Sequence, residues 1–310
     1  MPASIVVHKL HEYSGHVGSI YSLAVNGAQT TAYTSGDDGT VAAWNLLATS
    51  DEGIGVMKVE KAIYALCSVP DFNWLIAGMS DGTVHFIDPQ AKQILHTIRK
   101  ITEPVYNIRY ESERQYLWVL YGKGYLSVIR LPDFEEIGFR KLAEDHLRDM
   151  IFSPIEPVIF FGASDHRILA MNRESGIIQS DWVAHDNSVF SLAIDPKGRY
   201  LLSGGRDAHL NVWEATAPYA ALEKIPAHNF TINDIAFSPD GKYFMTASRD
   251  KTLKLWDANS LQLLKVIDMF RNQGHRHSVN RVVWLKDGTI LSAGDDRRLI
   301  RWGLTVGAED

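Results

Sequence analysis

The sequence predicts an all-β protein, a seven-bladed β-propeller of four-stranded antiparallel blades. The first observation behind this prediction is a repeat of about 43 residues, in which an Asp stands six residues before a Trp. This pair occurs at Asp38 and Trp44, Asp207 and Trp213, Asp250 and Trp256, and Asp296 and Trp302. A fixed offset repeated along the chain marks one supersecondary unit copied in tandem.

The same frame continues through the divergent middle of the chain. Asp81, Gly124 and Asp165 occupy the frame position there, and successive frame positions are 41 to 46 residues apart throughout. Seven such units fill the chain, so we predict one domain over residues 1–310. It consists of an initial strand in 1–14 and repeats at approximately 15–58, 59–100, 101–142, 143–183, 184–226, 227–273 and 274–310.

Each repeat reads as four short strands. In the sixth repeat, the apolar runs lie at 232–237, 242–248, 252–257 and 261–268, with Pro-Asp-Gly after the first and Arg-Asp-Lys after the second. Runs of this length that are rich in β-branched and aromatic residues, bounded by turn residues, indicate strands. Four strands per repeat, copied around a centre, are typical of a β-propeller.

The two ends of the chain predict how the ring closes. Only eight residues follow Trp302, too few and too polar for a good outer strand. Residues 4–13 alternate between apolar and polar side chains but have no repeat of their own. We therefore expect the N-terminal strand to pair onto the last blade, which leaves no open edge there.

The motifs resemble the WD40 family over nearly the whole chain. That family places a Gly-His pair before each blade and an aromatic-acid pair after its frame Asp. Here the first pair appears as Gly15-His16, Ala184-His185, Ala227-His228 and Gly274-His275, and the second is literal at Trp256-Asp257. Repeats two to four depart most from the pattern, because they lack both the His and the Trp.

The resemblance implies a buried hydrogen-bonded network in four of the repeats. In each, a buried indole N–H needs an acceptor, and a hydroxyl can accept from Trp while it donates to His. The same trio of hydroxyl, His and Asp in four repeats favours scaffolding over a hydrolase triad. The implied networks are His16, Thr34, Asp38 and Trp44; His185, Ser203, Asp207 and Trp213; His228, Thr246, Asp250 and Trp256; and His275, Ser292, Asp296 and Trp302.

The resemblance also implies a partner-binding top face around the central channel. Residues just after the first apolar residue of each inner strand, and those just before the frame Asp, point there in the family. Aromatic rings and arginines are typical of interface hot spots. The other interpretation is that the rings plug the channel mouth or pack blade against blade. The residues concerned are Tyr21, Tyr64, Tyr106, Arg148 and Phe190, with Lys123, Arg206 and Arg249, and Phe270 in a loop inserted before the last repeat.

Composition limits the other functional classes. The net charge is −6 without a Lys/Arg cluster, which argues against nucleic acid as a partner. His275 and His277 have a spacing sometimes used for metals, but His275 already belongs to a network, so we expect no metal and no cofactor.

Cys67 is the only cysteine, which indicates a reducing compartment. We find no signal peptide and no membrane-spanning stretch, and expect a cytoplasmic location, with the nucleus as the alternative.

These observations predict a non-enzymatic protein-interaction scaffold that binds a peptide or protein through its top face. Two alternatives stay open. One is a propeller enzyme with a site in the central channel, although the inner strands offer only scattered Asp and Ser there. The other is a weak phospholipid or nucleic-acid binder that uses the basic residues of the top face.

Overall fold

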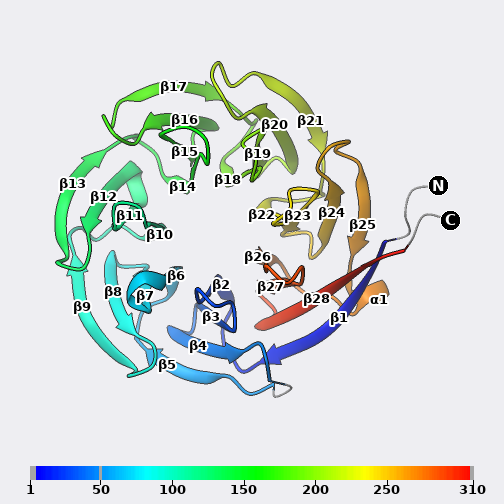
Figure 1. The fold of residues 1–310 in the computed structure, drawn as a ribbon, viewed down its shortest axis with the longest axis horizontal. Coiled ribbons are helices and arrows are strands. Elements are labelled where there is room, and N and C mark those ends of the chain that lie inside the picture. Colours follow the sequence, from blue (N-terminus) through cyan, green and yellow to red (C-terminus); the bar gives the residue numbers. More distant parts are fainter. Residues whose placement is uncertain (1–4, 49–50, 308–310) are drawn as a thin grey trace.

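Seven four-stranded antiparallel sheets are arranged radially around a common centre (Figure 1). The structure is a computed structural model and describes residues 5–48 and 51–307. Six of the sheets each consist of four consecutive strands, and the seventh combines three strands from the C-terminal end with one from the N-terminal end. The predicted seven-bladed β-propeller is therefore confirmed.

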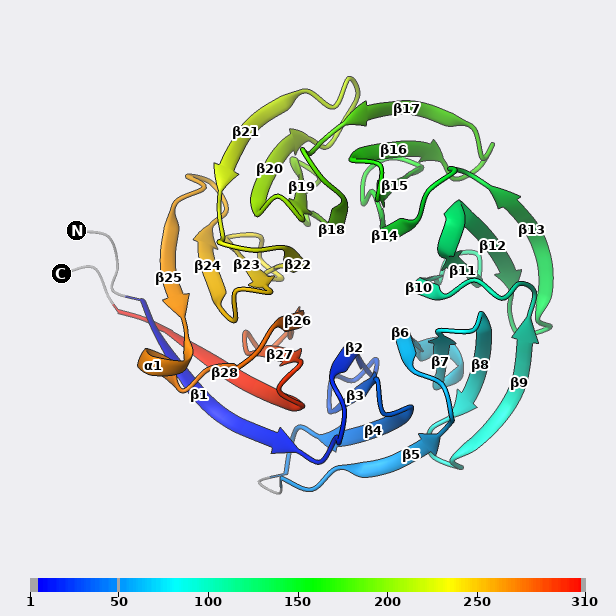
Figure 2. The ribbon, with the colours of Figure 1, turned by 180° about the vertical axis from the view of Figure 1, so that it is seen from behind.

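The strands of blades one to six run from the centre of the disc to its rim in chain order, as Figures 1 and 2 show from the two sides. In blades one to three they are β2 (Ile20–Val25), β3 (Thr31–Gly36), β4 (Thr40–Asn45) and β5 (Ile54–Lys58); β6 (Ile63–Val69), β7 (Trp74–Met79), β8 (Thr83–Asp88) and β9 (Gln93–Arg99); and β10 (Val105–Glu111), β11 (Tyr116–Tyr121), β12 (Tyr125–Arg130) and β13 (Glu135–Lys141). Short 3₁₀ turns lie at η1 (Pro70–Phe72) and η2 (Gly122–Gly124).

Blades four to seven continue this pattern, and one helical turn precedes the last blade. The strands are β14 (Leu147–Phe152), β15 (Val158–Ala163), β16 (Arg167–Asn172) and β17 (Ile178–Val183); β18 (Val189–Ile194), β19 (Tyr200–Gly205), β20 (His209–Glu214) and β21 (Ala221–Pro226); β22 (Ile232–Phe237), β23 (Tyr243–Ser248), β24 (Leu253–Asp257) and β25 (Leu263–Ile267); and β26 (Val279–Trp284), β27 (Ile290–Gly294) and β28 (Arg298–Val306) with β1 (Ile5–Ser14). The helical turn is α1 (Met269–Asn272).

The core lies between neighbouring blades. The second strands are almost entirely buried, whereas most of the outer strands expose more than half of their residues, as in β15 and β21. Met245 and Leu255 of blade six, for example, pack with Val282 and Ile300 of blade seven in one apolar cluster. Because every blade is sandwiched between two others, its apolar side chains are buried on both faces, which is the main source of stability.

The ring closes through β1, which is the outermost strand of blade seven. It pairs antiparallel with β28, from Ile5 opposite Val306 to Ser14 opposite Arg298. Val7 and Tyr13 of β1 are buried, and Arg298 donates to Glu12 across the pair at 3.0 Å. The predicted closure by the N-terminal strand is confirmed, although residues 1–4 of the predicted segment lie outside the described residues.

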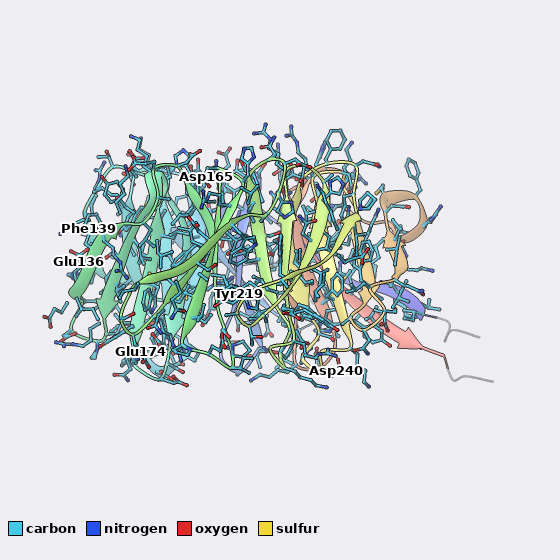
Figure 3. All side chains as sticks on the ribbon, turned by 90° about the horizontal axis from the view of Figure 1, so that it is seen from above. Glu136, Phe139, Asp165, Glu174, Tyr219 and Asp240 are labelled. Atoms are coloured by element: carbon cyan, nitrogen blue, oxygen red, sulfur yellow. The ribbon has the colours of Figure 1, made fainter. Side chains whose placement is uncertain are left out.

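The two faces of the disc carry different loops. Figure 3 shows the disc edge-on, with Asp165 on one face and Glu174 and Asp240 on the other. Asp165 lies in the turn between β15 and β16, and antiparallel pairing puts the connections between blades on that same side. We call this the top face. Among the described residues, no helix has the length and apolar character that crossing a membrane requires.

Candidate functional site

The four predicted networks are continuous hydrogen-bonded chains. Trp44 Nε1 donates to Thr34 Oγ1 at 2.7 Å, and the same oxygen lies 2.7 Å from His16 Nε2. His16 Nδ1 lies 2.9 Å from the Asp38 carboxylate. A carboxylate only accepts, so Nδ1 carries the proton and Nε2 accepts from the hydroxyl. The networks of His185, His228 and His275 repeat this arrangement at comparable distances.

Each network also fixes two loops of the top face to each other. Asp250 accepts from the backbone N–H groups of Asn229 at 3.1 Å and Thr252 at 3.0 Å, so it joins the connection before blade six to its β23–β24 turn. Burial alone would raise the pKa of Asp250, but the His228 hydrogen bond and these donors hold it well below its ordinary value. The networks thus brace the loops from which a binding surface is built.

A ring of seven side chains surrounds the channel mouth on the top face. We call it the mouth ring. Together with Arg281, these side chains line a cavity of about 420 Å³. Each of them directly follows the first apolar residue of its inner strand in the sequence. The mouth ring consists of Tyr21, Tyr64, Tyr106, Arg148, Phe190, Asn233 and Asn280.

The aromatic half of the mouth ring is a continuous stack. The Tyr21 and Tyr64 rings meet edge to face at 5.6 Å, and Tyr64 lies parallel to Tyr106 at 6.2 Å. The guanidinium of Arg148 lies 4.7 Å from the Tyr106 ring centre and 5.3 Å from that of Phe190. All five side chains are half-buried, so they contact one another and still present surface to the mouth cavity.

The polar half of the mouth ring is fixed to the backbone. Asn233 Nδ2 donates to the Val279 carbonyl at 2.8 Å, and Asn280 Nδ2 donates to the Ile20 carbonyl at 2.8 Å. These bonds link blades six, seven and one. The amides are therefore oriented before any ligand arrives, which lowers the entropic cost of binding.

Below the mouth lies a charged layer that sequence reasoning missed. Asp149 and Asp234 accept from the backbone N–H groups of Leu192 and Val282 in the next blade, at 2.8 and 2.9 Å. Arg109 approaches Asp149 at 3.5 Å, and Arg281 approaches Asp234 at 4.0 Å. Burial raises the pKa of Asp234 to about 6, against the opposing effect of Arg281.

A signal for this layer was present in the sequence. Asp149 and Asp234 occupy the same step of their inner strands, and each bonds to a residue about one repeat further on. The two acids therefore serve as clamps between blades, and the arginines balance their charge.

The three predicted cations differ in their surroundings. Lys123 pairs with Glu103 at 2.6 Å, so its charge is largely neutralised. Arg206 and Arg249 are exposed, and within the described ranges neither forms an ion pair. None of the three lines the mouth cavity. The predicted cationic flank is therefore a set of separate loop residues rather than part of the mouth.

Phe270 also lies apart from the mouth ring. The predicted inserted loop contains the single turn α1, and the Phe270 side chain is 97% exposed. Figure 1 places α1 at the outer rim of the disc beside β1. The structure therefore assembles Tyr21, Tyr64, Tyr106, Arg148 and Phe190 into one site but leaves Phe270 outside it.

Blade three contains a buried polar network of its own. Trp118 Nε1 donates to the buried Glu111 carboxylate at 3.0 Å, and Arg173 of blade four approaches Glu111 at 3.1 Å. Trp118 lies on the second strand rather than the third, so the frame that located the four network tryptophans did not reveal it. Blade three, which lacks the usual network, thus has a buried ion pair with blade four.

Other chemistry finds little support in the part of the chain that the structure describes. No group of three or more His, Cys, Asp or Glu side chains is placed to hold a metal ion there. Cys67 is a free thiol whose pKa burial raises to about 12, so it stays protonated at neutral pH.

Comparisons with known proteins agree with this architecture. Bovine striatin-3 is 24% identical over 236 residues, which cover 68% of this chain and 29% of that protein. Human striatin is 21% identical over 234 residues, and the Dictyostelium discoideum striatin homolog is 22% identical over 246. Each comparison covers 68% of this chain and 30% of the relative. The chain thus spans less than a third of the length of these relatives.

A family model described as WD domain, G-beta repeat matches more than half of the chain. The matched residues are 7–45, 55–88, 177–214, 220–257 and 265–302. The unmatched stretch 89–176 contains blade three and the first three strands of blade four, where the usual Trp networks are missing. With its seven blades and its four His-Trp networks, the chain belongs to the WD40 repeat family.

Proposed function

We propose that this propeller is a non-enzymatic interaction scaffold that binds a segment of a partner protein at the mouth ring. The observation that carries the proposal is the stack of three tyrosines, Arg148 and Phe190 around one cavity. Large aromatic rings and arginine bury much area at a small entropic cost, so they concentrate binding energy in a few contacts. Membership of the WD40 family supports a protein-interaction role.

The chemistry of the mouth ring favours a partner segment with apolar and acidic side chains. The aromatic half offers ring faces and edges to an apolar group. Arg148 donates its Nε–H to Ser164 at 2.8 Å, and no carboxylate among the described residues pairs with it. Its outer N–H groups are thus oriented to receive a carboxylate, for which a planar guanidinium is well suited.

The two acids of the charged layer below the mouth support scaffolding rather than catalysis. Asp149 and Asp234 each accept a backbone N–H from a neighbouring blade, so both are engaged in holding the ring together. A general acid or base needs to reach a reacting group with its proton-accepting oxygen. The proposal also places the protein in the cytoplasm or the nucleus, where its single thiol would stay reduced.

Affinity capture with a substituted mouth ring tests the proposal. The variant Tyr64→Ala/Tyr106→Ala/Arg148→Ala would be compared with wild type in native lysate, after circular dichroism and melting show that it is folded. A partner recovered by wild type and lost by this variant is the expected result. The control is Leu47→Ala/Lys197→Ala, which removes exposed side chains outside the top face. Partners that both variants retain would contradict the proposed site.

A further inference from the structure

A second surface combines exposed aromatic rings with cations on blades six and seven. We call it the basic rim. Its members lie in the connections and turns on the top face of these two blades. Phe270 is 97% exposed and Phe230 is 59% exposed, and both rings lie in loops that also carry cations. The basic rim consists of Phe230, Arg249, Lys251, Phe270, Arg271, Arg276 and Arg297.

The positive charges of the basic rim face outward, while the acids of the same loops are used internally. Asp250 and Asp296 are bound to network histidines, and their side chains are only 6% and 3% exposed. Asp268 caps α1 and meets Arg271 only at 3.8 Å. For Arg249, Lys251, Arg276 and Arg297, the described residues supply no ion-pair partner. The surface of these loops is therefore cationic, although the whole chain carries a net charge of −6.

Hydrogen bonds keep the members of the basic rim together. The Arg249 N–H donates to the Thr231 carbonyl at 3.0 Å, which places the β23–β24 turn beside the connection that carries Phe230. The Arg276 N–H donates to Asp296 at 2.8 Å, which places it beside Arg297. Asn233 Nδ2 donates to Ser278 Oγ at 2.9 Å and so joins the top loops of the two blades.

The position of Phe270 is defined by its short helical turn. The Asp268 carboxylate accepts from the N–H groups of Phe270 and Arg271, both at 2.8 Å. The Gly274 N–H donates to the Asp268 carbonyl at 3.0 Å and closes the turn. The backbone that presents the exposed ring is therefore fixed by its own hydrogen bonds.

Two of the cations occupy backbone positions that favour glycine. Lys251 and Arg297 have φ values of +74° and +68°. The corresponding turn residue is Gly39 in blade one, Gly82 in blade two, His166 in blade four and Ala208 in blade five, each also at positive φ. A side chain in this left-handed region is strained, because its Cβ lies close to the following carbonyl oxygen. The chain thus keeps a cation at two turns where glycine would be less strained.

We propose that the basic rim docks the propeller onto a membrane that contains anionic phospholipids, with Phe270 and Phe230 entering the headgroup region. Clustered Lys and Arg side chains are attracted to the negative potential of such a membrane, and apolar groups that enter the interface add to the binding. Because Phe270 is 97% exposed, its ring can enter an apolar interface without any movement of the protein around it.

The charge distribution of the top face also sets an orientation. Exposed acids are found in the connections and turns of blades two and four, at Glu60, Glu144, Asp145 and Asp165, and in the β3–β4 turn of blade one, at Asp37. An anionic membrane attracts the edge that carries α1 and repels the sector of blades two to four. The disc therefore docks tilted, with α1 nearest the lipid, and the channel mouth stays open to a protein partner.

Vesicle co-sedimentation of the full chain tests this proposal. We expect binding to vesicles of phosphatidylcholine with phosphatidylserine, weak binding to phosphatidylcholine alone, and loss of binding as salt rises. Lys251→Gly/Arg297→Gly removes two cations at positions that tolerate glycine, and should weaken binding about 30-fold. Phe230→Ser/Phe270→Ser should weaken it to a similar extent.

Matched controls separate this surface from the rest of the molecule. Leu47→Ser/Lys197→Ser removes an exposed apolar residue and a cation elsewhere, and should bind vesicles as wild type does. Tyr64→Ala/Tyr106→Ala/Arg148→Ala should also bind normally, so that failure at the mouth ring and failure at the basic rim give different results. The proposal is overturned if wild type does not sediment with anionic vesicles, if the basic-rim variants bind unchanged, or if the surface retains only an acidic protein or RNA.

Discussion

The guanidinium of Arg148 lies 4.7 Å from the centre of the Tyr106 ring and belongs to the next blade along the chain. Such a contact is worth about 0.5–1 kcal/mol at a partly exposed site. Arg148 is thus held in place by its neighbours while its charge stays available at the channel mouth.

Charge reversal at Arg148 should change which ligands the mouth accepts. On a peptide array, wild type should prefer sequences that join an aromatic residue to Asp or Glu over the same sequences with Lys. Arg148→Glu should reverse this preference, because the carboxylate would repel acidic ligands. Arg148→Lys keeps the charge but loses the planar stacking, so it should keep the preference at lower affinity. Identical array profiles for wild type and Arg148→Glu would rule out this role for Arg148.

Removal of one network acid should destabilise the whole propeller. Asp250→Ala strands His228 and two backbone N–H groups, and should lower the free energy of unfolding by about 1–3 kcal/mol in urea denaturation. Asp165→Ala provides the matched control, because Asp165 occupies the same frame position but is exposed and has no network. Its cost should be about 0.5 kcal/mol or less. Equal effects of the two substitutions would show that the network contributes no special stability.

Loss of the closing strand should be more severe than any single substitution. Deletion of residues 1–12 removes most of β1, uncovers the edge of β28 and exposes the apolar side chains around Val7. The urea midpoint should fall markedly. Val7→Ala should cost about 1–2 kcal/mol, whereas Val6→Ala, at a position 43% exposed, should cost much less. A truncated chain with the midpoint of wild type would contradict closure by β1.

Asp234 should make stability depend on pH. Its pKa is raised to about 6 in the folded chain by burial, above the ordinary value of 3.8, so the folded state binds the proton more tightly. The tighter proton binding stabilises the folded state; this stabilisation is fully present below pH 3.8 and is lost as pH rises through 6. Between pH 4 and 7, this group should lower the free energy of unfolding of wild type by roughly 1–3 kcal/mol. Asp234→Asn should not show that decrease.

The measurement for Asp234 is the difference between wild type and Asp234→Asn in urea denaturation at several pH values. Because both proteins share all other titrating groups, their difference isolates the contribution of this carboxyl. The asparagine can still accept the Val282 N–H, so the clamp between blades remains. Parallel pH profiles would show that Asp234 is not shifted.

The repeat explains why so much of the mouth could be located in the sequence. The position directly after the first apolar residue of each inner strand predicted Tyr21, Tyr64, Tyr106, Arg148 and Phe190. The prediction was possible because seven copies of one unit place equivalent residues around one axis. The network residues followed from the same register. Wherever the unit is copied faithfully, position in the sequence determines position in space.

The features that sequence reasoning missed depend on contacts that the repeated pattern does not specify. The pairing of Trp118 and Glu111 with Arg173 crosses from blade three to blade four, in the stretch where the frame is weakest. The neutralisation of Lys123 depends on Glu103, which approaches only after the connection before blade three has folded. The separation of Phe270 from the mouth depends on the length and capping of α1, which the repeat does not specify.

The pairing of Ile5 with Val306 has a mechanical consequence. A force that draws the two ends of the chain apart acts on this pair first and then on each following pair in turn, from Val6 with Thr305 inward. The residue pairs between β1 and β28 therefore separate one after another, and the force is not distributed over all their hydrogen bonds at once. A ring whose stability comes from the packing of seven blades would thus yield to tension at the edge of one of them.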